Sequence, residues 1–330
     1  MGVSVVPGKL HRLGCIRLGT VRPRLSWRRI LKSTLVSAGV GLVAITGACG
    51  DPGVDPNISA LVTVSEFLVG ENRFPVRIVT NDGGTFPNAV VHVRFFTLEG
   101  ERSTFQFEAD ATYREVPVAT HHTHADGTVH DHGAARRFFT VDAVRFDRPG
   151  IWLAEFTVRP TSHRSFRVET AFMVQTGSTA PLSGELVPAV SNPTRHDVVD
   201  LREITSVANP IEGMYDLTVE EAVAAQEPFV VVFSTPLFCG TRMCGPVMEV
   251  VAKLYPRYVG RVNFIHIEPF DLSIARSEGR LVPVPAVEQW GLRTEPWVFV
   301  VNPDGRVASR IEGLVAAEEL ALAIDSLLAP

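Results

Sequence analysis

Two cysteines in the C-terminal half of the chain are the first candidates for chemistry. Cys239 and Cys244 come after the apolar run at 229–233 and before valines at helical spacing. The N–H groups at a helix N-terminus favour a thiolate, so we expect a redox-active pair there. Cys239 is predicted to be the exposed nucleophile, and Cys244 the less accessible thiol, one turn or more inside the helix. The alternative is a structural disulfide, or two unreactive thiols.

The spacing of the two thiols restricts where they lie. Five positions along a regular helix rotate a side chain by about 500°, which leaves the thiols about 140° apart and unable to form a disulfide. Cys239 must therefore lie in the loop before the helix, with Gly240 allowing the chain to fold back. Arg242 is expected to help stabilise the thiolate of Cys239.

A dense group of histidines is the second candidate. Imidazole is the commonest ligand of zinc and copper, and five of the chain's ten histidines fall between residues 121 and 132. Asp126-Gly127 predicts a hairpin tip. With a loop at 125–127, His122 lies opposite His130 and the even-numbered positions share one face; a loop at 126–127 divides the histidines between faces. A solvated polar loop is the alternative. The candidate copper or zinc ligands are His121, His122, His124, His130 and His132.

The N-terminus has the pattern of a secretory signal. Its first 50 residues contain eight Lys or Arg and no Asp or Glu, and an apolar stretch at 35–48 follows the basic region. That stretch is short for a membrane span. The ending ITGAC at 45–49 resembles a bacterial lipobox, which implies cleavage after residue 48 and a lipid on Cys49. A twin-arginine signal at Arg28-Arg29 and a plain membrane anchor are the alternatives.

Loss of this leader changes the charge and the cysteine count. The remainder has 23 Lys or Arg against 36 Asp or Glu, a net charge of −13 compared with −5 for the whole chain. This argues against a nucleic-acid partner, which would need a basic surface. Cys15 leaves with the leader, so Cys239 and Cys244 remain as the free pair. Outside the cytoplasm such a pair can persist as a disulfide. We expect an extracytoplasmic bacterial protein, held at the membrane by the lipid on Cys49.

The rest of the chain divides by pattern. Residues 57–176 hold runs of alternating Val, Phe, Thr and Arg separated by turn signals, which predicts an antiparallel β-sandwich. Residues 177–213, rich in Pro, Ser, Thr and Asn, are interpreted as a linker. After them strands are expected at 229–233, 262–267, 297–301 and 307–311, and helices at 217–225, after Pro246, at 286–290 and at 316–328.

Two resemblances follow from these patterns. The pieces VGENRF and PGIWLAEF are similar to the Ig-like modules of bacterial cell-surface and copper-handling proteins. Residues 214–330, with two thiols after the first buried strand and Thr294-Glu295-Pro296 before the third, resemble the thioredoxin superfamily. That resemblance implies a cis proline at Pro296, packed beside the active disulfide. The predicted fold class is thus multidomain, an N-terminal all-β Ig-like sandwich followed by a C-terminal α/β thioredoxin-like domain.

The chain also departs from that family. Four residues separate Cys239 from Cys244 where thioredoxins have two, and apolar Val231 and Val232 stand where the family has a buried acid. Proton transfer to the second thiol must then use water or another group. Sco-type copper chaperones carry a closer cysteine pair and a distant histidine. The histidine downstream of the pair here is His266, which its apolar strand marks as a structural residue.

Two functions from different classes remain. One is a thiol-disulfide oxidoreductase acting on protein partners, in which Cys239 attacks, Cys244 resolves, Pro296 shapes the substrate groove and no cofactor is required. The other is a non-enzymatic lipoprotein that handles copper or zinc through the histidines at 121–132 and the thiol pair.

Overall fold

The computed structural model describes residues 55–116, 121–123, 129–131 and 136–329. The predicted signal and Cys49 lie outside these residues. None of the helices described is long and apolar enough to cross a membrane. The elements of the first part are β1 (Ile58–Val62), β2 (Phe67–Leu68), β3 (Gly70–Thr80), β4 (Val90–Glu99), β5 (Arg102–Val116), β6 (His121–Thr123), β7 (Val129–Asp131), β8 (Arg136–Phe146), β9 (Gly150–Arg159) and β10 (Phe166–Gln175).

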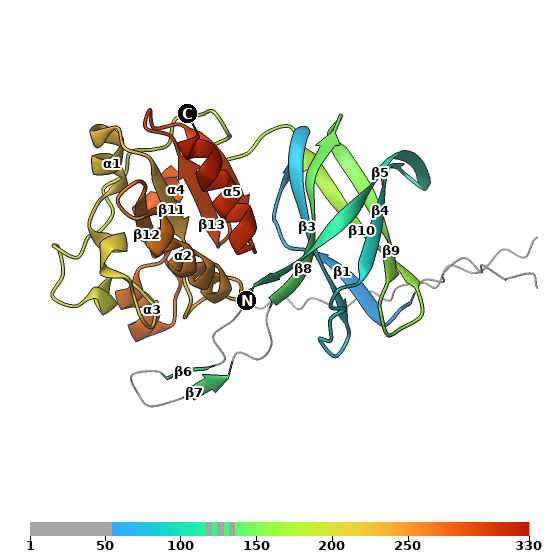
Figure 1. Cartoon of the computed structure of the whole chain (residues 1–330), viewed down its shortest axis with the longest axis horizontal. Helices are drawn as coiled ribbons and strands as arrows, with labels where there is room; N and C mark the ends of the chain where they lie inside the picture. Colours follow the sequence, from blue (N-terminus) through green and yellow to red (C-terminus); the bar gives the residue numbers. More distant parts are fainter. Residues whose placement is uncertain (1–54, 117–120, 124–128, 132–135, 330) are drawn as a thin grey trace, which may run out of the picture. The chain divides into compact units, whose positions relative to one another are not determined.

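Eight of these strands form one curled sheet (Figure 1). Its order is β1-β3-β8-β5-β4-β9-β10-β2, and β10 and β2 run parallel. The long strand β5 explains the continuity, because residues 102–111 pair with β4 and residues 112–116 pair with β8. The predicted sandwich of two separate sheets is therefore wrong: a single strand carries the hydrogen-bonded ladder from one half to the other.

The core of this sheet is built from aromatic side chains. Strand β4 alternates between buried and partly exposed positions, as expected for a strand with one face against the core. The rings of Phe74 and Phe95 lie 5.1 Å apart, and those of Phe146 and Trp152 lie 4.9 Å apart, in edge-on arrangements. Such aromatic contacts fix the inner face of the sheet.

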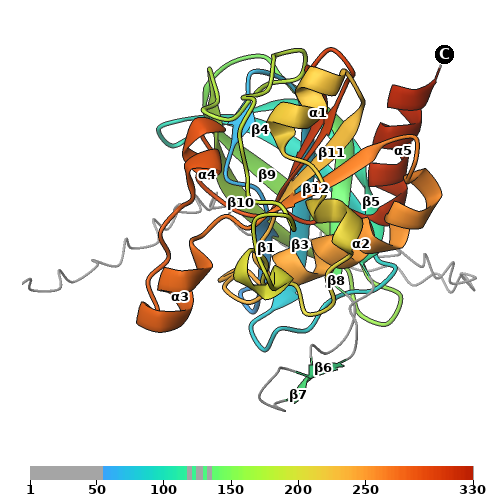
Figure 2. The same ribbon diagram turned by 90° about the vertical axis from the view of Figure 1, so that its left-hand side faces the viewer.

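The second part of the chain holds a four-stranded sheet and the helices around it (Figure 2). Strand β11 at its centre runs parallel to β12 and antiparallel to β13, and β14 forms the other edge. The elements are η1 (Leu201–Glu203), η2 (Glu212–Tyr215), α1 (Val219–Ala225), β11 (Phe229–Phe233), α2 (Cys244–Tyr258), β12 (Asn263–Ile267), α3 (Leu272–Glu278), α4 (Pro285–Gln289), β13 (Trp297–Val301), β14 (Val307–Glu312) and α5 (Ala317–Leu328).

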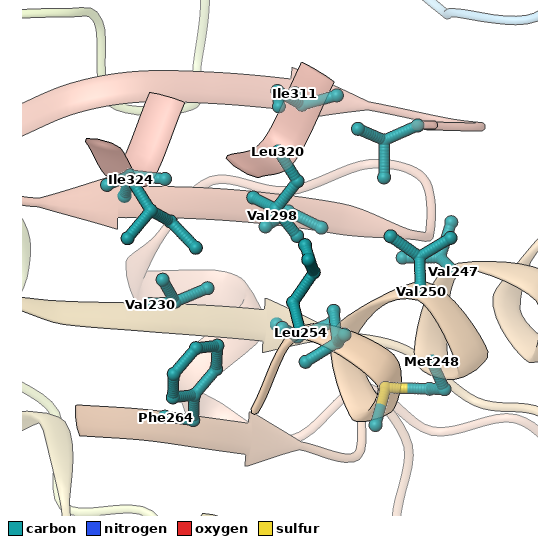
Figure 3. Packing of buried hydrophobic residues seen from close by; sticks show 14 of the residues in the cluster. Val230, Val247, Met248, Val250, Leu254, Phe264, Val298, Ile311, Leu320 and Ile324 are labelled. Atoms are coloured by element: carbon teal, nitrogen blue, oxygen red, sulfur yellow. The ribbon is translucent and has the colours of Figure 1, made fainter. Parts of the chain in front are cut away.

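Both faces of β11 are buried, as the continuous apolar run predicts. Val230 and Val232 belong to the cluster that contains residues of α2 and α5, such as Leu254 and Ile324 (Figure 3). Phe229, Val231 and Phe233 belong to the opposite cluster, with residues of α1 and α4. This two-sided packing fixes the end of β11, from which the chain continues to the two cysteines.

The predicted fold class is wrong, because these elements do not form a separate α/β domain. Residues Gly50–Pro330 are one compact unit, and its structure is mostly β. Val116 of β5 and Phe138 of β8 are buried in the same cluster as residues of α2 and α5. Arg73 of β3 also pairs with Glu319 of α5 at 2.8 Å. Independent domains each have a core of their own and few contacts across their boundary, whereas here core side chains and a partly buried ion pair join the two parts.

The individual elements agree well with the sequence pattern. The predicted strand at 297–301 is β13 to the residue, and the four predicted helices correspond to α1, α2, α4 and α5. Helix α3 was not predicted. The segment 177–213, interpreted as a linker, contains η1 and residues such as Val187 and Val190 that are buried in the cluster around β11.

Candidate functional site

The two thiols lie where β11 leads into α2. Cys239 is in the loop before the helix, as predicted, and Cys244 is the first residue of α2 rather than a turn or more inside it. The helix begins this late because Arg242 has φ +58, a left-handed conformation that an α-helix cannot include. Gly240, the residue expected to turn the chain, has no positive φ. The turn is closed instead by a hydrogen bond of 3.2 Å from the Arg242 N–H to the Cys239 carbonyl.

The two cysteines differ in environment. Both are free thiols; Cys239 is partly exposed and Cys244 is fully buried. The Cys244 thiol donates a hydrogen bond to the sulfur of Cys239. Burial raises the pKa of Cys244 far above its usual value, and the neighbouring Cys239 sulfur raises it further. Cys239 is thus the more exposed of the two thiols and Cys244 the less accessible one, as predicted.

The Cys239 thiolate is stabilised by a set of hydrogen-bond donors. The Cys244 thiol lowers the pKa of Cys239 most, the Thr241 hydroxyl at 3.1 Å lowers it further, and the resulting pKa is about 5. The N–H groups of Cys244 and Met243 also donate to this sulfur. Helix α2 has no side-chain cap, and the thiolate accepts from the N–H groups of its N-cap residue Met243 and its first residue Cys244, which have no partner within the helix. Arg242, expected to contribute, is not among these groups.

Glu295 is the site residue that the sequence analysis missed. One of its carboxylate oxygens and the two sulfurs lie within 4.8 Å of one another. Burial and the nearby Cys239 thiolate raise the pKa of Glu295 to about 7. The Glu295–Pro296 peptide bond is cis, as the resemblance implied for Pro296. The position directly before that proline was the one available signal for this carboxyl.

A layer of polar residues lies behind Cys244. The Ser234 hydroxyl donates to the Cys244 carbonyl at 3.2 Å, and the Thr235 N–H lowers the pKa of the Cys244 thiol. Glu268 is buried, which raises its pKa to about 7, while hydrogen bonds from Thr235 and Ser206 oppose that shift. These contacts fix the buried thiol against the end of the sheet.

His266 is a structural residue, as expected. Its Nε2 lies 2.8 Å from the Ser234 carbonyl, and its Nδ1 lies 2.9 Å from the Tyr215 hydroxyl. Burial lowers the pKa of His266 to about 4, so the ring is neutral at physiological pH. Both ring nitrogens have partners within the core, which leaves neither available to a metal.

The histidine-rich segment is described in part. His121 and His122 lie in β6 and His130 lies in β7, with His122 directly opposite His130. This is the register expected for a loop at 125–127. His124 and His132 lie outside the described residues.

Comparisons with known proteins assign no family to the chain. No protein-family model and no curated protein matches it. Among solved structures, that of murine CRIg is matched at a TM-score of 0.20 and 9% sequence identity, covering 36% of this chain and 98% of that one. A likeness of this size carries no argument about fold or function, so the chemistry must be inferred from the geometry of the site itself.

Proposed function

We propose that Cys239 and Cys244 form a reversible redox pair that exchanges disulfides with protein thiols. The observation that carries this proposal is the asymmetry of the two sulfurs. Cys239 is a partly exposed thiolate with four hydrogen-bond donors, and Cys244 is a buried thiol in hydrogen-bond contact with it. One sulfur is thus suited to attack a partner, and the other to resolve the product.

The exchange follows from this arrangement. The Cys239 thiolate attacks a partner disulfide, whose S–S bond breaks as the mixed disulfide forms; the departing sulfur takes a proton from water. Cys244 then gives its proton to Glu295 and attacks Cys239, which releases the second partner sulfur. Two electrons pass to the partner, and the pair becomes a disulfide. Cys239 carries no charge in the mixed disulfide, and this removes one cause of the raised pKa of Glu295. The lower pKa favours the ionised carboxylate, which can accept the proton from Cys244.

The same stabilisation indicates the direction of exchange. Donors that hold Cys239 as a thiolate stabilise the reduced pair relative to the disulfide, and this makes the disulfide a better oxidant. We therefore propose that the protein passes its disulfide to dithiols of partner proteins, by the reverse of the sequence above.

The reduction potential tests this proposal. We expect a value above about −200 mV at pH 7, measured by equilibrating the purified protein in glutathione buffers and alkylating the free thiols. Above pH 7 reduction takes up one proton, on Cys244, which gives a slope of about 30 mV per pH unit. The slope should steepen below pH 7, where Glu295 of the reduced protein also takes up a proton. A potential below about −300 mV, typical of structural disulfides, would contradict the proposal.

Metal handling is a second candidate function. Within the described part of the chain, Cys239, Cys244 and Glu295 bring two sulfurs and a carboxylate oxygen within 4.8 Å of one another, a donor set suited to zinc. The opposite positions of His122 and His130 in the β6–β7 ladder favour a separate copper or zinc site. Bound metal at the thiols would protect both from alkylation.

A titration of the reduced protein with Zn(II) separates these two sites. If the thiols hold the metal, Cys239→Ser should abolish binding and His122→Ala/His130→Ala should leave it unchanged. If the histidines hold it, the pattern is reversed, and affinity falls as pH drops through about 6.5 because imidazole must be neutral. No binding by the parent protein at micromolar Zn(II) would dismiss this candidate.

The location of the protein is proposed from its sequence alone. The acid-free basic leader, the apolar stretch and the ITGAC ending at 45–49 support an extracytoplasmic protein anchored by a lipid on Cys49. Intact-mass analysis of the protein from bacterial membranes should show a chain that begins at Cys49 with added acyl mass. A chain that retains earlier residues, or lacks that mass, would contradict the proposal.

A further inference from the structure

The backbone that carries Glu295 is fixed on both sides by the end of β14. The Thr294 hydroxyl donates to Oε1 of Glu312 at 2.6 Å, and the Gly313 N–H donates to the Pro296 carbonyl at 2.9 Å. Glu312 is buried, at 8% exposure, so no water competes freely for that hydrogen bond. Residues 294–296 are therefore held by residues 312–313.

The same two residues also contact the segment between β1 and β2. The Ser65 N–H donates to Oε1 of Glu312 at 2.9 Å, and the Ser65 hydroxyl lies 3.5 Å from that of Thr294. Gly313 has φ +74, and a Cβ at this position would lie 2.3 Å from the Thr63 carbonyl oxygen. Glycine is required there because the two backbones approach so closely.

We propose that residues 63–65, which join β1 to β2, act through Glu312 and Gly313 as positioning residues that hold the Glu295 carboxyl against the two thiols. The inference rests on the proposed function, in which Glu295 accepts the proton from Cys244. The strands before residue 176 are then part of the redox site, and the site is incomplete without them.

The physical reason is the distance dependence of charge interactions. Glu295 affects Cys239 through a Coulomb energy that varies inversely with separation in a site of low polarity. Glu312 shares one oxygen between two donors, so loss of either donor frees the other to reorient. A shift of the 294–296 backbone would then change the interaction of Glu295 with the thiols without altering either cysteine.

The ionisation of Glu295 provides the readout. Iodoacetate is anionic and iodoacetamide is neutral, so the ratio of the Cys239 alkylation rates with iodoacetamide and iodoacetate rises when Glu295 ionises. In the parent full chain we expect this ratio to rise about fivefold, with its midpoint near pH 7. Thr294→Val removes the donor to Glu312, and Gly313→Ala forces the 63–65 segment away. Each should move the midpoint by at least half a pH unit or reduce the rise below twofold.

Two further variants act as controls. Thr294→Ser retains the hydroxyl and should restore the parent profile. Glu319→Gln weakens the ion pair with Arg73, which joins the same two parts of the unit elsewhere, and should leave the profile unchanged even if the protein unfolds at lower temperature. Parent-like profiles in Thr294→Val and Gly313→Ala would overturn the inference. Because alkylation needs no partner protein, this outcome is distinct from a failure of disulfide exchange.

Discussion

The Cys244→Ser variant should accumulate mixed disulfides between Cys239 and partner proteins, whereas the parent protein should not. The Cys239 thiolate of this variant can still attack the disulfide of an oxidised partner, which is the final step of the proposed direction run backwards. Serine cannot resolve the mixed disulfide that forms, so it accumulates. The serine hydroxyl can still donate a hydrogen bond to Cys239 in place of the thiol, so the nucleophile stays ionised. Non-reducing electrophoresis of acid-quenched cells should show high-mass bands that disappear on reduction.

The matched control is Cys239→Ser, which should trap no partner because the attacking sulfur is absent. On the purified reduced parent, iodoacetamide at pH 7 should modify Cys239 at least about 100-fold faster than Cys244, since the buried thiol is almost entirely protonated. Faster modification of Cys244, or trapping by Cys239→Ser rather than by Cys244→Ser, would reverse the assigned roles. If neither variant traps a partner, metal handling by the same residues becomes the better explanation.

The strand pattern was predictable wherever burial alone decides it. The all-apolar run of β11 and the exact limits of β13 follow from side chains buried on both faces. The position of Cys239 before the helix also followed, because two cysteines five residues apart within one helix could not form the disulfide of a redox pair. These are local or periodic properties, and periodicity is visible in a single sequence.

The start of α2 was not predictable in the same way. Arginine rarely adopts a positive φ, so nothing in the sequence marks Arg242 rather than Gly240 as the turning residue. The turn is stabilised by tertiary contacts, among them the hydrogen bonds from the helix N-terminus to Cys239. Because the chain turns at Arg242, Cys244 is the first residue of the helix and its thiol lies within hydrogen-bond reach of Cys239.

The division into independent domains failed for a related reason. The sequence pattern changes from alternating strands to strands and helices. A single hydrophobic core can nevertheless contain residues from both sides of that change. Phe138 lies in a run of consecutive buried residues in β8 and Val116 ends β5, but no local signal shows that they share a core with α2 and α5. The role of Glu295 depends in the same way on contacts between residues distant in sequence.

The pH dependence of Cys239 reactivity should have two steps. The first, near pH 5, is ionisation of Cys239; the second, near pH 7, is ionisation of Glu295 beside an existing thiolate. Cys239 ionises while Glu295 is still neutral, so Glu295→Gln should leave the first step in place. It should remove the second step, together with the about fivefold rise in the ratio of iodoacetamide to iodoacetate rates. Stopped alkylation followed by mass spectrometry, between pH 4 and 9 with a chelator present, measures both steps.

The corresponding effect on stability has opposite signs for the two groups. The pKa of Cys239 is lowered in the folded protein, so its contribution is complete above the unfolded pKa and is lost as pH falls through about 5. The pKa of Glu295 is raised, so its contribution is present at low pH and is lost as pH rises through about 7. The free energy of unfolding of the reduced Glu295→Gln variant, measured in urea, should therefore no longer contain the loss that Glu295 causes as pH rises through about 7. It should still contain the loss that Cys239 causes as pH falls through about 5. A single alkylation step near pH 8.5 in the parent, the value of an ordinary thiol, would refute the assignment of Cys239 as a stabilised nucleophile.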